Sequence, residues 1–351
     1  IEYGTLEELN IELGDGGNAF TIESTHDALT TLMSGGGDDV VNIRTSAGQT
    51  DVYVEAGDDI IHVGSEAPDI GGNLNNIALL NLYGFSGVDV LDFDDTGDDE
   101  QNINQGTLTQ TSLTGFGMQG GANYFGMENL EASLGAGVDN VNVDSTMTRA
   151  DGFRTVSVVN TGGGDDIVTI DLQAPSDGFF ALNTEAGEDN VDAGSSTLPL
   201  IIFGGEDDDW IVSGSAEDVL FGDRGRIDYR DANGILITRL GIGLGERNVL
   251  APGAPDLTSL DVPLQQTDGT QHHPDVILSR DLLTGGDDEL FAGEGADIVL
   301  GGSGMDHIET FGQAHLGEMD ADIVAGDNAT VTFVNGAFQE IDTTAVVDAL
   351  P

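Results

Sequence analysis

Apolar residues in this chain occur in short runs of four to six positions that are rich in valine and isoleucine. Glycine, aspartate or asparagine bounds these runs, as in the stretch Asp39–Ile43. Such runs are typical of β-strands, because strands are short, β-branched and separated by turn residues. Helical periodicity is nearly absent, so the pattern predicts an all-β chain.

The turns between these runs repeat along the chain. The sharpest copy spans Gly301–Glu309, where a glycine-rich turn leads to an aspartate and then to an apolar position. Two copies lie directly upstream in the same frame, which places Asp288, Asp297 and Asp306 at intervals of nine residues. Further copies are the nine-residue pair Asp209 and Asp218, the single units 34–42, 54–62, 134–142, 161–169 and 184–192, and a looser unit at 84–92.

Two longer segments also recur along the chain, and they suggest a division into two domains. Residues 19–39 return at 140–166, and residues 218–229 return at 322–333. The predicted domains are residues 1–203, a broad-coil parallel β-helix with two related blocks, and residues 204–351, a β-roll or β-helix interrupted by a proline-containing loop at about 241–273.

Short strands separated by tight turns at coil length stack in parallel, so that each rung buries the apolar side chains of its neighbours. We therefore expect a right-handed parallel β-helix or β-roll solenoid. The residues expected in its interior are Val41, Ile43, Ile61, Val63, Val168, Ile170, Val299 and Ile308.

The composition adds a large excess of negative charge that a folded chain has to accommodate. The chain has 351 residues, of which 64 are acidic and nine are basic, for a formal net charge of -55. Carboxylates at this density repel one another unless counterions neutralise them, and divalent cations are suited to that role. Nucleic acid is excluded as a partner, because phosphate binding needs basic patches. The chain has no cysteine, so neither disulfides nor thiol chemistry are available.

The repeated turns carry the chemistry of a calcium site. Glycine allows positive φ and lets backbone carbonyls point inward, while the aspartate after the turn supplies a carboxylate. Stacked turns would gather the six or more oxygen ligands that Ca²⁺ prefers. The expected calcium ligands are Asp39, Asp59, Asp139, Asp166, Asp189, Asp209, Asp218, Asp288, Asp297, Asp306 and Asp322.

The unit Gly301–Glu309 resembles the nonapeptide of hemolysin-type (RTX) calcium-binding proteins, Gly-Gly-x-Gly-x-Asp-x-apolar-x. The resemblance implies calcium-ligand roles for Asp297 and Asp306, and, where family glycines are replaced, for Asp288, Asp209 and Asp218. The chain as a whole looks like a repetitive segment of large bacterial surface or secreted proteins. The resemblance to these proteins implies that the chain folds when it binds Ca²⁺ outside the cell.

The expected function is therefore that of an extracellular calcium-binding structural or adhesive repeat protein, such as a segment of a surface layer, filament or adhesin. Its partners would be calcium ions, copies of itself or other surface proteins, and glycans. The alternative is a carbohydrate- or surface-binding module that uses the 241–273 loop. A polysaccharide-active β-helix enzyme is less favoured, because no catalytic motif is present and the chain has no lysine. No apolar run is long enough to predict a transmembrane segment.

Overall fold

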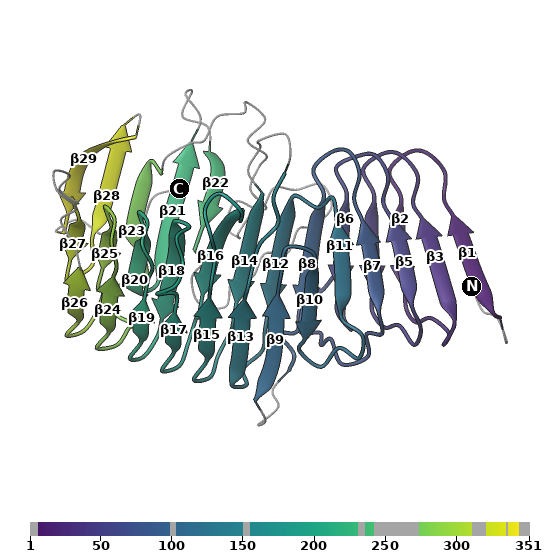
Figure 1. The fold of residues 1–351 in the computed structure, drawn as a ribbon, viewed down its shortest axis with the longest axis horizontal. Helices are drawn as coiled ribbons and strands as arrows, with labels where there is room; N and C mark the ends of the chain where they lie inside the picture. The colour runs from purple at the N-terminus through teal and green to yellow at the C-terminus, as the bar shows by residue number, and fades with distance from the viewer. Residues whose placement is uncertain are drawn as a thin grey trace.

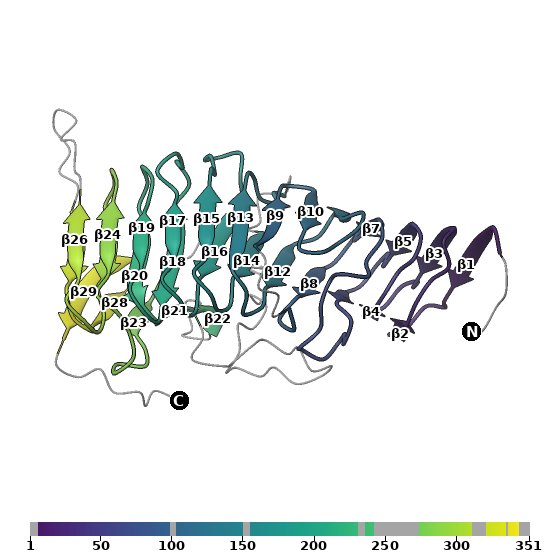
Figure 2. The ribbon, with the colours of Figure 1, turned by 90° about the horizontal axis from the view of Figure 1, so that it is seen from below.

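The computed structural model describes residues 6–98, 103–149, 155–230, 236–241, 274–310, 321–334 and 336–343. Their strands form two long sheets, here called sheet A and sheet B, that run the length of an elongated solenoid (Figure 1). The view from below separates the two sheets and shows successive rungs side by side (Figure 2). The chain is thus an all-β parallel solenoid, which confirms the predicted fold class.

Each rung contributes one strand to sheet A and the next to sheet B. In spatial order, the 13 described strands of sheet A are β1 (Glu8–Glu12), β3 (Leu29–Met33), β5 (Thr50–Tyr53), β7 (Leu80–Tyr83), β11 (Ala122–Phe125), β10 (Ser112–Gly115), β9 (Asn104–Leu108), β13 (Asp139–Val143), β15 (Ile167–Ile170), β17 (Asn190–Asp192), β19 (Trp210–Val212), β24 (Glu289–Ala292) and β26 (His307–Thr310). The 11 described strands of sheet B are β2 (Ala19–Ile22), β4 (Val40–Ile43), β6 (Ile60–Val63), β8 (Val90–Asp94), β12 (Asn129–Ser133), β14 (Val156–Asn160), β16 (Phe179–Asn183), β18 (Leu200–Gly205), β20 (Val219–Asp223), β25 (Ile298–Leu300) and β27 (Ile323–Ala325).

The apolar core lies between the two sheets and is built from equivalent positions of successive rungs. Val41, Ile61 and Leu91, for example, are register partners on β4, β6 and β8, and all three are fully buried. Fully burying one such side chain contributes about 1.5–3 kcal/mol. Of the eight predicted interior residues, seven are at most 1% exposed, and Ile308 packs against the same cluster while partly buried.

Sheet A departs from the parallel pattern at one point. Strand β10 pairs antiparallel with both β9 and β11, whereas the other described pairs of sheets A and B are parallel. The β9–β10 hairpin adds two strands to sheet A, while β8 and β12 remain direct neighbours in sheet B. The sequence pattern did not predict this insertion.

A third sheet of antiparallel strands packs beside the solenoid near its C-terminal end (Figure 1). Its described strands, in spatial order, are β22 (Leu236–Leu240), β21 (Gly225–Arg230), β23 (Val276–Ser279), β28 (Thr330–Val334) and β29 (Ala337–Asp342). A second apolar cluster joins this side sheet to sheet B through residues such as Phe203, Phe221 and Ile227. The side sheet, too, was not predicted.

The side sheet contains a concentrated group of the chain's arginines. The buried Asp228 carboxylate accepts hydrogen bonds from Arg226, Arg230 and Arg239 at 2.6–3.3 Å. Burial alone would raise the pKa of Asp228, but the bonds from Arg226 and Arg239 lower it to about 2. These cations therefore neutralise an internal charge.

Both long sheets continue through residue 203 without a change of strand order, and the domain boundary expected there stays a prediction. The loop expected at 241–273 lies outside the described residues apart from Gly241. In the part of the chain that the structure describes, no helix is long and apolar enough to cross a membrane.

Candidate functional site

Acidic side chains line up from rung to rung at the turns of the solenoid. The first ladder lies where the chain passes from sheet A to sheet B. It comprises Asn18, Asp39, Asp59, Asp89 and Glu128, each directly before a strand of sheet B.

A second ladder lies on the opposite turns, where the chain passes from sheet B to sheet A. Its members are Asp139, Asp166, Asp189, Asp209, Asp288 and Asp306. A short third ladder, Asp218, Asp297 and Asp322, occupies the sheet A to sheet B turns of the last rungs. Aspartates that are nine residues apart in the sequence therefore lie on opposite edges of the solenoid. In the tightest coil, the aspartates that stack on each other are 18 residues apart.

Within each ladder, one carboxylate oxygen forms a rung-to-rung hydrogen bond. Oδ1 of an aspartate accepts the backbone N–H of the residue at the preceding ladder position, at 2.7–3.2 Å. Oδ1 of Asp218, the first member of the third ladder, accepts the N–H of Leu200 at 2.8 Å. The bond from Asp209 to Asp288 joins residues that are 79 positions apart. The long insertion after β20 therefore leaves the ladder in register.

The other carboxylate oxygen has a different environment. Nearly all ladder aspartates are at most 2% exposed, so burial denies water to this oxygen. Oδ2 is buried and makes no hydrogen bond in Asp39, Asp59, Asp89, Asp166, Asp189, Asp209, Asp218, Asp288 and Asp306. A buried acceptor without a partner costs about 1–3 kcal/mol, and more if it is charged, so a row of them calls for protons or cations.

At Asp89, Asp209 and Asp306, a glycine five residues earlier lets Oδ2 and a backbone carbonyl oxygen approach the turn closely. A β-carbon at Gly204 would lie 2.4 Å from Oδ2 of Asp209 and 2.0 Å from the carbonyl oxygen of Gly222 in the next rung. At Gly301, a β-carbon would lie 2.3 Å from Oδ2 of Asp306 and 2.6 Å from the carbonyl oxygen of Gly326. A carboxylate oxygen and a carbonyl oxygen thus lie close to the same glycine, and both are ligand types that a hard cation prefers.

Asn18, at the start of the first ladder, places a hydrogen-bond donor among the turn oxygens. Its amide Nδ2 donates to the carbonyl oxygens of Gly14, Gly16 and Ser34 at 2.6–3.1 Å, and to Oδ1 of Asp39 at 3.2 Å. Four oxygens therefore surround a group that carries partial positive charge. The aspartates of the later rungs bring a second oxygen instead of this amide.

Asparagine also precedes the second ladder. Asn104 is the register partner of Asp139, and its amide Nδ2 donates to the carboxylates of Asp95 and Asp98 at 3.1 and 3.3 Å. Both long ladders therefore begin at a neutral amide, and the acidic positions follow it.

All eleven predicted ligand residues occupy ladder positions, but as a row rather than as clusters. Among the residues that the structure describes, no three His, Asp or Glu side chains converge as a metal-binding group. Any cation bound at these turns would have to take backbone carbonyl oxygens together with the carboxylates of adjacent rungs. The residues present fit Ca²⁺ in this way at Asp89, Asp209, Asp288 and Asp306, where an unpartnered Oδ2 and a carbonyl oxygen of the next rung approach the same glycine.

Sequence reasoning missed two acidic members of the first ladder, Asp89 and Glu128, and the amide Asn18. Asp89 holds the sixth position of the looser unit 84–92, the position that aspartate holds in the other units, and this could have identified it. Glu128 gives no such signal, because a longer side chain replaces the aspartate and still accepts the N–H of Asp89 through Oε2 at 2.7 Å.

Outer aspartates accompany the buried ones in several rungs. Oδ1 of the exposed Asp38 accepts the N–H of Asp58, and Oδ1 of Asp58 accepts that of Val88, at 3.0 and 2.9 Å. Asp208 and Asp287 make the same kind of contact to Asp287 and Met305. The adjacent aspartate pairs in the sequence therefore divide into a buried partner and an exposed one.

Burial raises the pKa values of the ladder carboxyls, and neighbouring carboxylates add to the effect. Desolvation, followed by the charges of Glu128 and Asp59, raises the pKa of Asp89 to about 8. The pKa of Asp209 rises to about 10, chiefly through burial and the charge of Asp189. Burial likewise raises the pKa of the ladder members Asp59 and Asp218 to about 6, of Asp166 to about 7, and of Asp139, Asp189 and Asp288 to about 8.

These shifts predict that, in a chelator, acid stabilises the fold. A carboxyl whose pKa is raised on folding stabilises the folded state below its unfolded pKa, and this contribution is lost as pH rises through the folded value. We therefore expect the chelated chain to be folded at about pH 5 and to lose its fold as the pH rises to about 8. Far-UV circular dichroism measures this loss. A calcium-loaded sample is the control and should lose less stability over this range; a chelated protein whose stability rises with pH would contradict the prediction.

Comparison of the chain with protein-family models, curated proteins and solved structures gave no match. The fold and the ladders therefore carry the functional argument by themselves.

Proposed function

We propose that this chain is an extracellular calcium-binding repeat segment with a structural or adhesive role, and that Ca²⁺ completes its fold. The observation that carries the proposal is the row of buried Oδ2 atoms without a hydrogen-bond partner, each at a glycine-rich turn. A formal net charge of -55 supports it, since a compact state at that charge needs cations.

The resemblance of Gly301–Glu309 to the hemolysin-type nonapeptide supports calcium rather than another cation. Mg²⁺ demands near-ideal octahedral geometry and dehydrates reluctantly, whereas Ca²⁺ accepts irregular sets of carbonyl and carboxylate oxygens. The ligands would come from the ladder carboxylates and the turn carbonyls. Millimolar calcium outside a cell would then favour the folded state, and low calcium inside a cell would favour an extended chain.

The ends of the solenoid support a role in assembly. Strands β1 and β2 at one end, and β26 and β27 at the other, have one described neighbour each within sheets A and B. Such strand edges can continue a stack into another copy or another surface protein. We therefore place the chain in a bacterial surface layer, filament or adhesin, and assign it no catalytic role.

Equilibrium dialysis against calcium tests the metal assignment. We expect several Ca²⁺ ions to remain with each folded chain, and an excess of magnesium to displace few of them. Asp144→Asn, which removes an exposed carboxylate outside the ladders, serves as the control and should retain the same number of ions. A chain that retains no calcium would contradict the proposal.

A further inference from the structure

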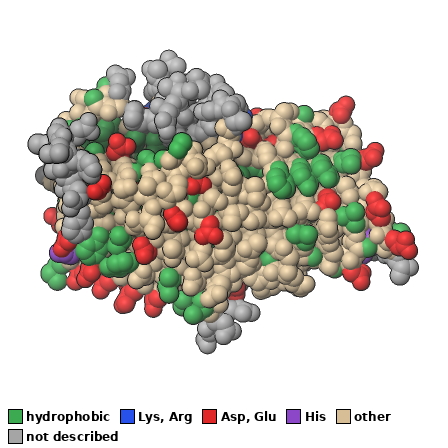
Figure 3. Space-filling view, in the orientation of Figure 1, with side chains coloured by type: hydrophobic (Ala, Val, Ile, Leu, Met, Phe, Trp, Pro, Cys, Tyr) green, Lys and Arg blue, Asp and Glu red, His purple; other side chains and the backbone are tan. Residues whose placement is uncertain are grey.

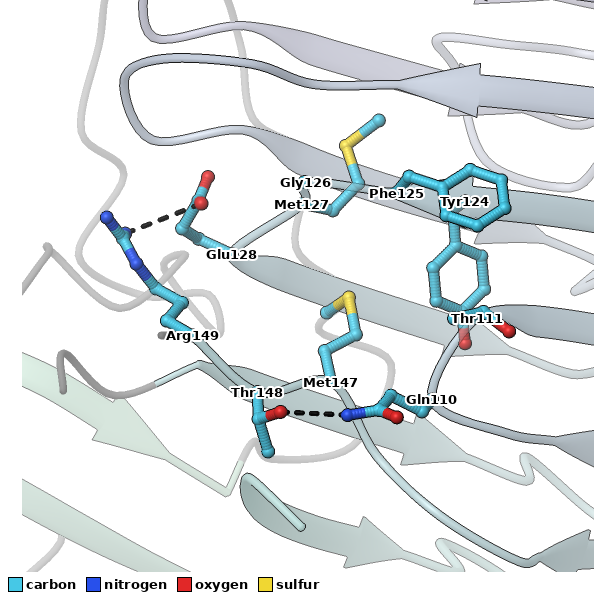
Figure 4. A pocket seen from close by; sticks show the side chains of 10 residues that line it. All are labelled: Gln110, Thr111, Tyr124, Phe125, Gly126, Met127, Glu128, Met147, Thr148 and Arg149. Carbon is cyan, nitrogen blue, oxygen red and sulfur yellow. Dashed lines mark hydrogen bonds and ion pairs between the residues drawn. The ribbon is translucent and has the colours of Figure 1, made fainter. Parts of the chain in front are cut away.

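A pocket opens where the β9–β10 hairpin interrupts the parallel order of sheet A (Figure 4). Its volume is about 430 Å³, within the range of small-molecule sites. The first ladder ends beside it, because Glu128 lines the pocket and accepts the N–H of Asp89. Insertions between the repeats of a solenoid often lie on its binding face, so this position is informative.

The apolar part of the pocket is rigidly held. Tyr124 is 1% exposed, and its hydroxyl donates to the carbonyl oxygen of Thr109 at 2.5 Å. Met127 and Met147 are also buried. Phe125, by contrast, is 45% exposed and supplies an aromatic wall at the mouth.

Phe125 is the last ring of a row along the outer surface of sheet A. The rings of Tyr53 and Tyr83 stack with centroids 4.6 Å apart, and those of Tyr83 and Phe125 with centroids 5.3 Å apart. Figure 3 shows hydrophobic side chains gathered on this part of the surface. Tyr83 covers one face of the Phe125 ring, yet Phe125 is 45% exposed and lines the pocket, so its exposed side is available to a ligand.

The polar part of the pocket is neutral as a whole. Arg149 pairs with Glu128 at 3.5 Å, and both side chains are largely buried. Nε2 of Gln110 donates to Oγ1 of Thr148 at 2.8 Å on the exposed side. An anionic ligand would have to compete with Glu128 inside a chain of strongly negative charge, and a cation would meet Arg149.

An amide row runs beside the aromatic row. Nδ2 of Asn123 donates to Oδ1 of Asn81 at 2.9 Å, and Nδ2 of Asn81 donates to Oδ1 of Asp51 at 2.7 Å. These side chains occupy the same three strands as the aromatic row, two positions earlier. A row of hydrogen-bonding groups and a row of aromatic rings therefore extend side by side from the pocket across strands β11, β7 and β5 of sheet A.

We propose that this pocket binds one end of a neutral saccharide chain, with a sugar ring on the exposed side of Phe125. Amide and hydroxyl groups at Gln110 and Thr148 suit sugar hydroxyls, because both kinds of group donate and accept hydrogen bonds. The remaining sugars lie along the amide and aromatic rows toward Asp51. This inference deepens the adhesive part of the proposed function, on which it rests for the exposure of the chain to extracellular glycans.

Saturation-transfer NMR on the full, calcium-loaded chain tests the proposal, with cello-, malto- and mannooligosaccharides as neutral probes and an alginate oligosaccharide as the anionic probe. We expect at least one neutral probe to bind. Phe125→Ala should weaken that binding about tenfold or more, because it removes the stacking face. Phe338→Ala is the matched control, since Phe338 is 47% exposed on the side sheet, and it should leave the affinity unchanged.

Three results would overturn the proposal: no neutral probe binds, only alginate binds, or Phe125→Ala binds as well as the parent chain. Circular dichroism of each variant with calcium shows first that it is folded. Failure of saccharide binding by a folded, calcium-loaded chain therefore rejects this site and leaves the calcium proposal standing.

Discussion

Replacing Asp209 by asparagine should lower the free energy of unfolding in millimolar calcium by about 2–4 kcal/mol, because it removes a buried charged ligand while leaving the shape intact. Oδ1 of the asparagine can still accept the N–H of Asp189, which Asp209 holds at 2.9 Å. In a chelator the order should reverse. A neutral amide avoids a buried charge there, much as Asn18 places an amide among four oxygens.

Urea unfolding of the two proteins in calcium measures the first effect. The pH at which each chelated protein loses its fold measures the second, and this pH should be higher for Asp209→Asn. Asp144→Asn removes an exposed charge outside the ladders and should change stability by less than about 0.5 kcal/mol in either condition. If Asp209→Asn matched the parent chain in calcium, the ladder carboxylates would be structural hydrogen-bond acceptors and not calcium ligands.

Replacing Gly87 by alanine should destabilise the solenoid by more than about 4 kcal/mol, because the rungs are packed too closely for a side chain at that turn. A β-carbon there would lie 1.8 Å from the carbonyl oxygen of Gly57 in the preceding rung. The φ angle of 130° at Gly87 adds backbone strain for any residue with a β-carbon.

Gly71→Ala separates these two causes. Gly71 has a φ angle of 94°, but a β-carbon there would meet no atom within 4 Å. This control should therefore cost only the strain, about 1–3 kcal/mol. Thermal unfolding in calcium compares the two variants. Equal losses of stability would mean that turn conformation, and not the close approach of rungs, requires glycine.

The repeat pattern was sufficient to predict the solenoid and its interior. Strand length, β-branched composition and glycine-aspartate turns all indicate the same structure, so Val41, Ile61 and Val168 are buried as expected. Spacing also identified the ladder positions, since an aspartate after a glycine-rich turn always falls directly before a strand.

The same spacing could not tell on which edge an aspartate lies. Asp209 and Asp218 belong to one nine-residue pair, yet they occupy opposite turns and join different ladders. The change of edge between Glu128 and Asp139 likewise depends on how many strands separate the turns, which local sequence does not record. The long-range pairing of the strands decides on which edge of the solenoid each aspartate lies.

The insertions were missed for a related reason. The side sheet contains short apolar runs that look like further rungs, whereas the strands of the β9–β10 hairpin are mostly polar and do not show the apolar pattern. Val331, for example, was part of a recognised repeat, but β28 pairs antiparallel with β23 instead of joining sheet B. The pocket beside the hairpin could not be predicted either, because it exists only where the insertion breaks the sheet.

A calcium titration of the chelated chain, followed by far-UV circular dichroism and size-exclusion chromatography at about pH 8, tests the central claim most directly. We predict an expanded chain with little strand signal in the chelator, which becomes compact and β-rich at millimolar calcium and does not respond to magnesium in the same way. A chain with the same strand signal and the same size in chelator and in calcium would contradict the account.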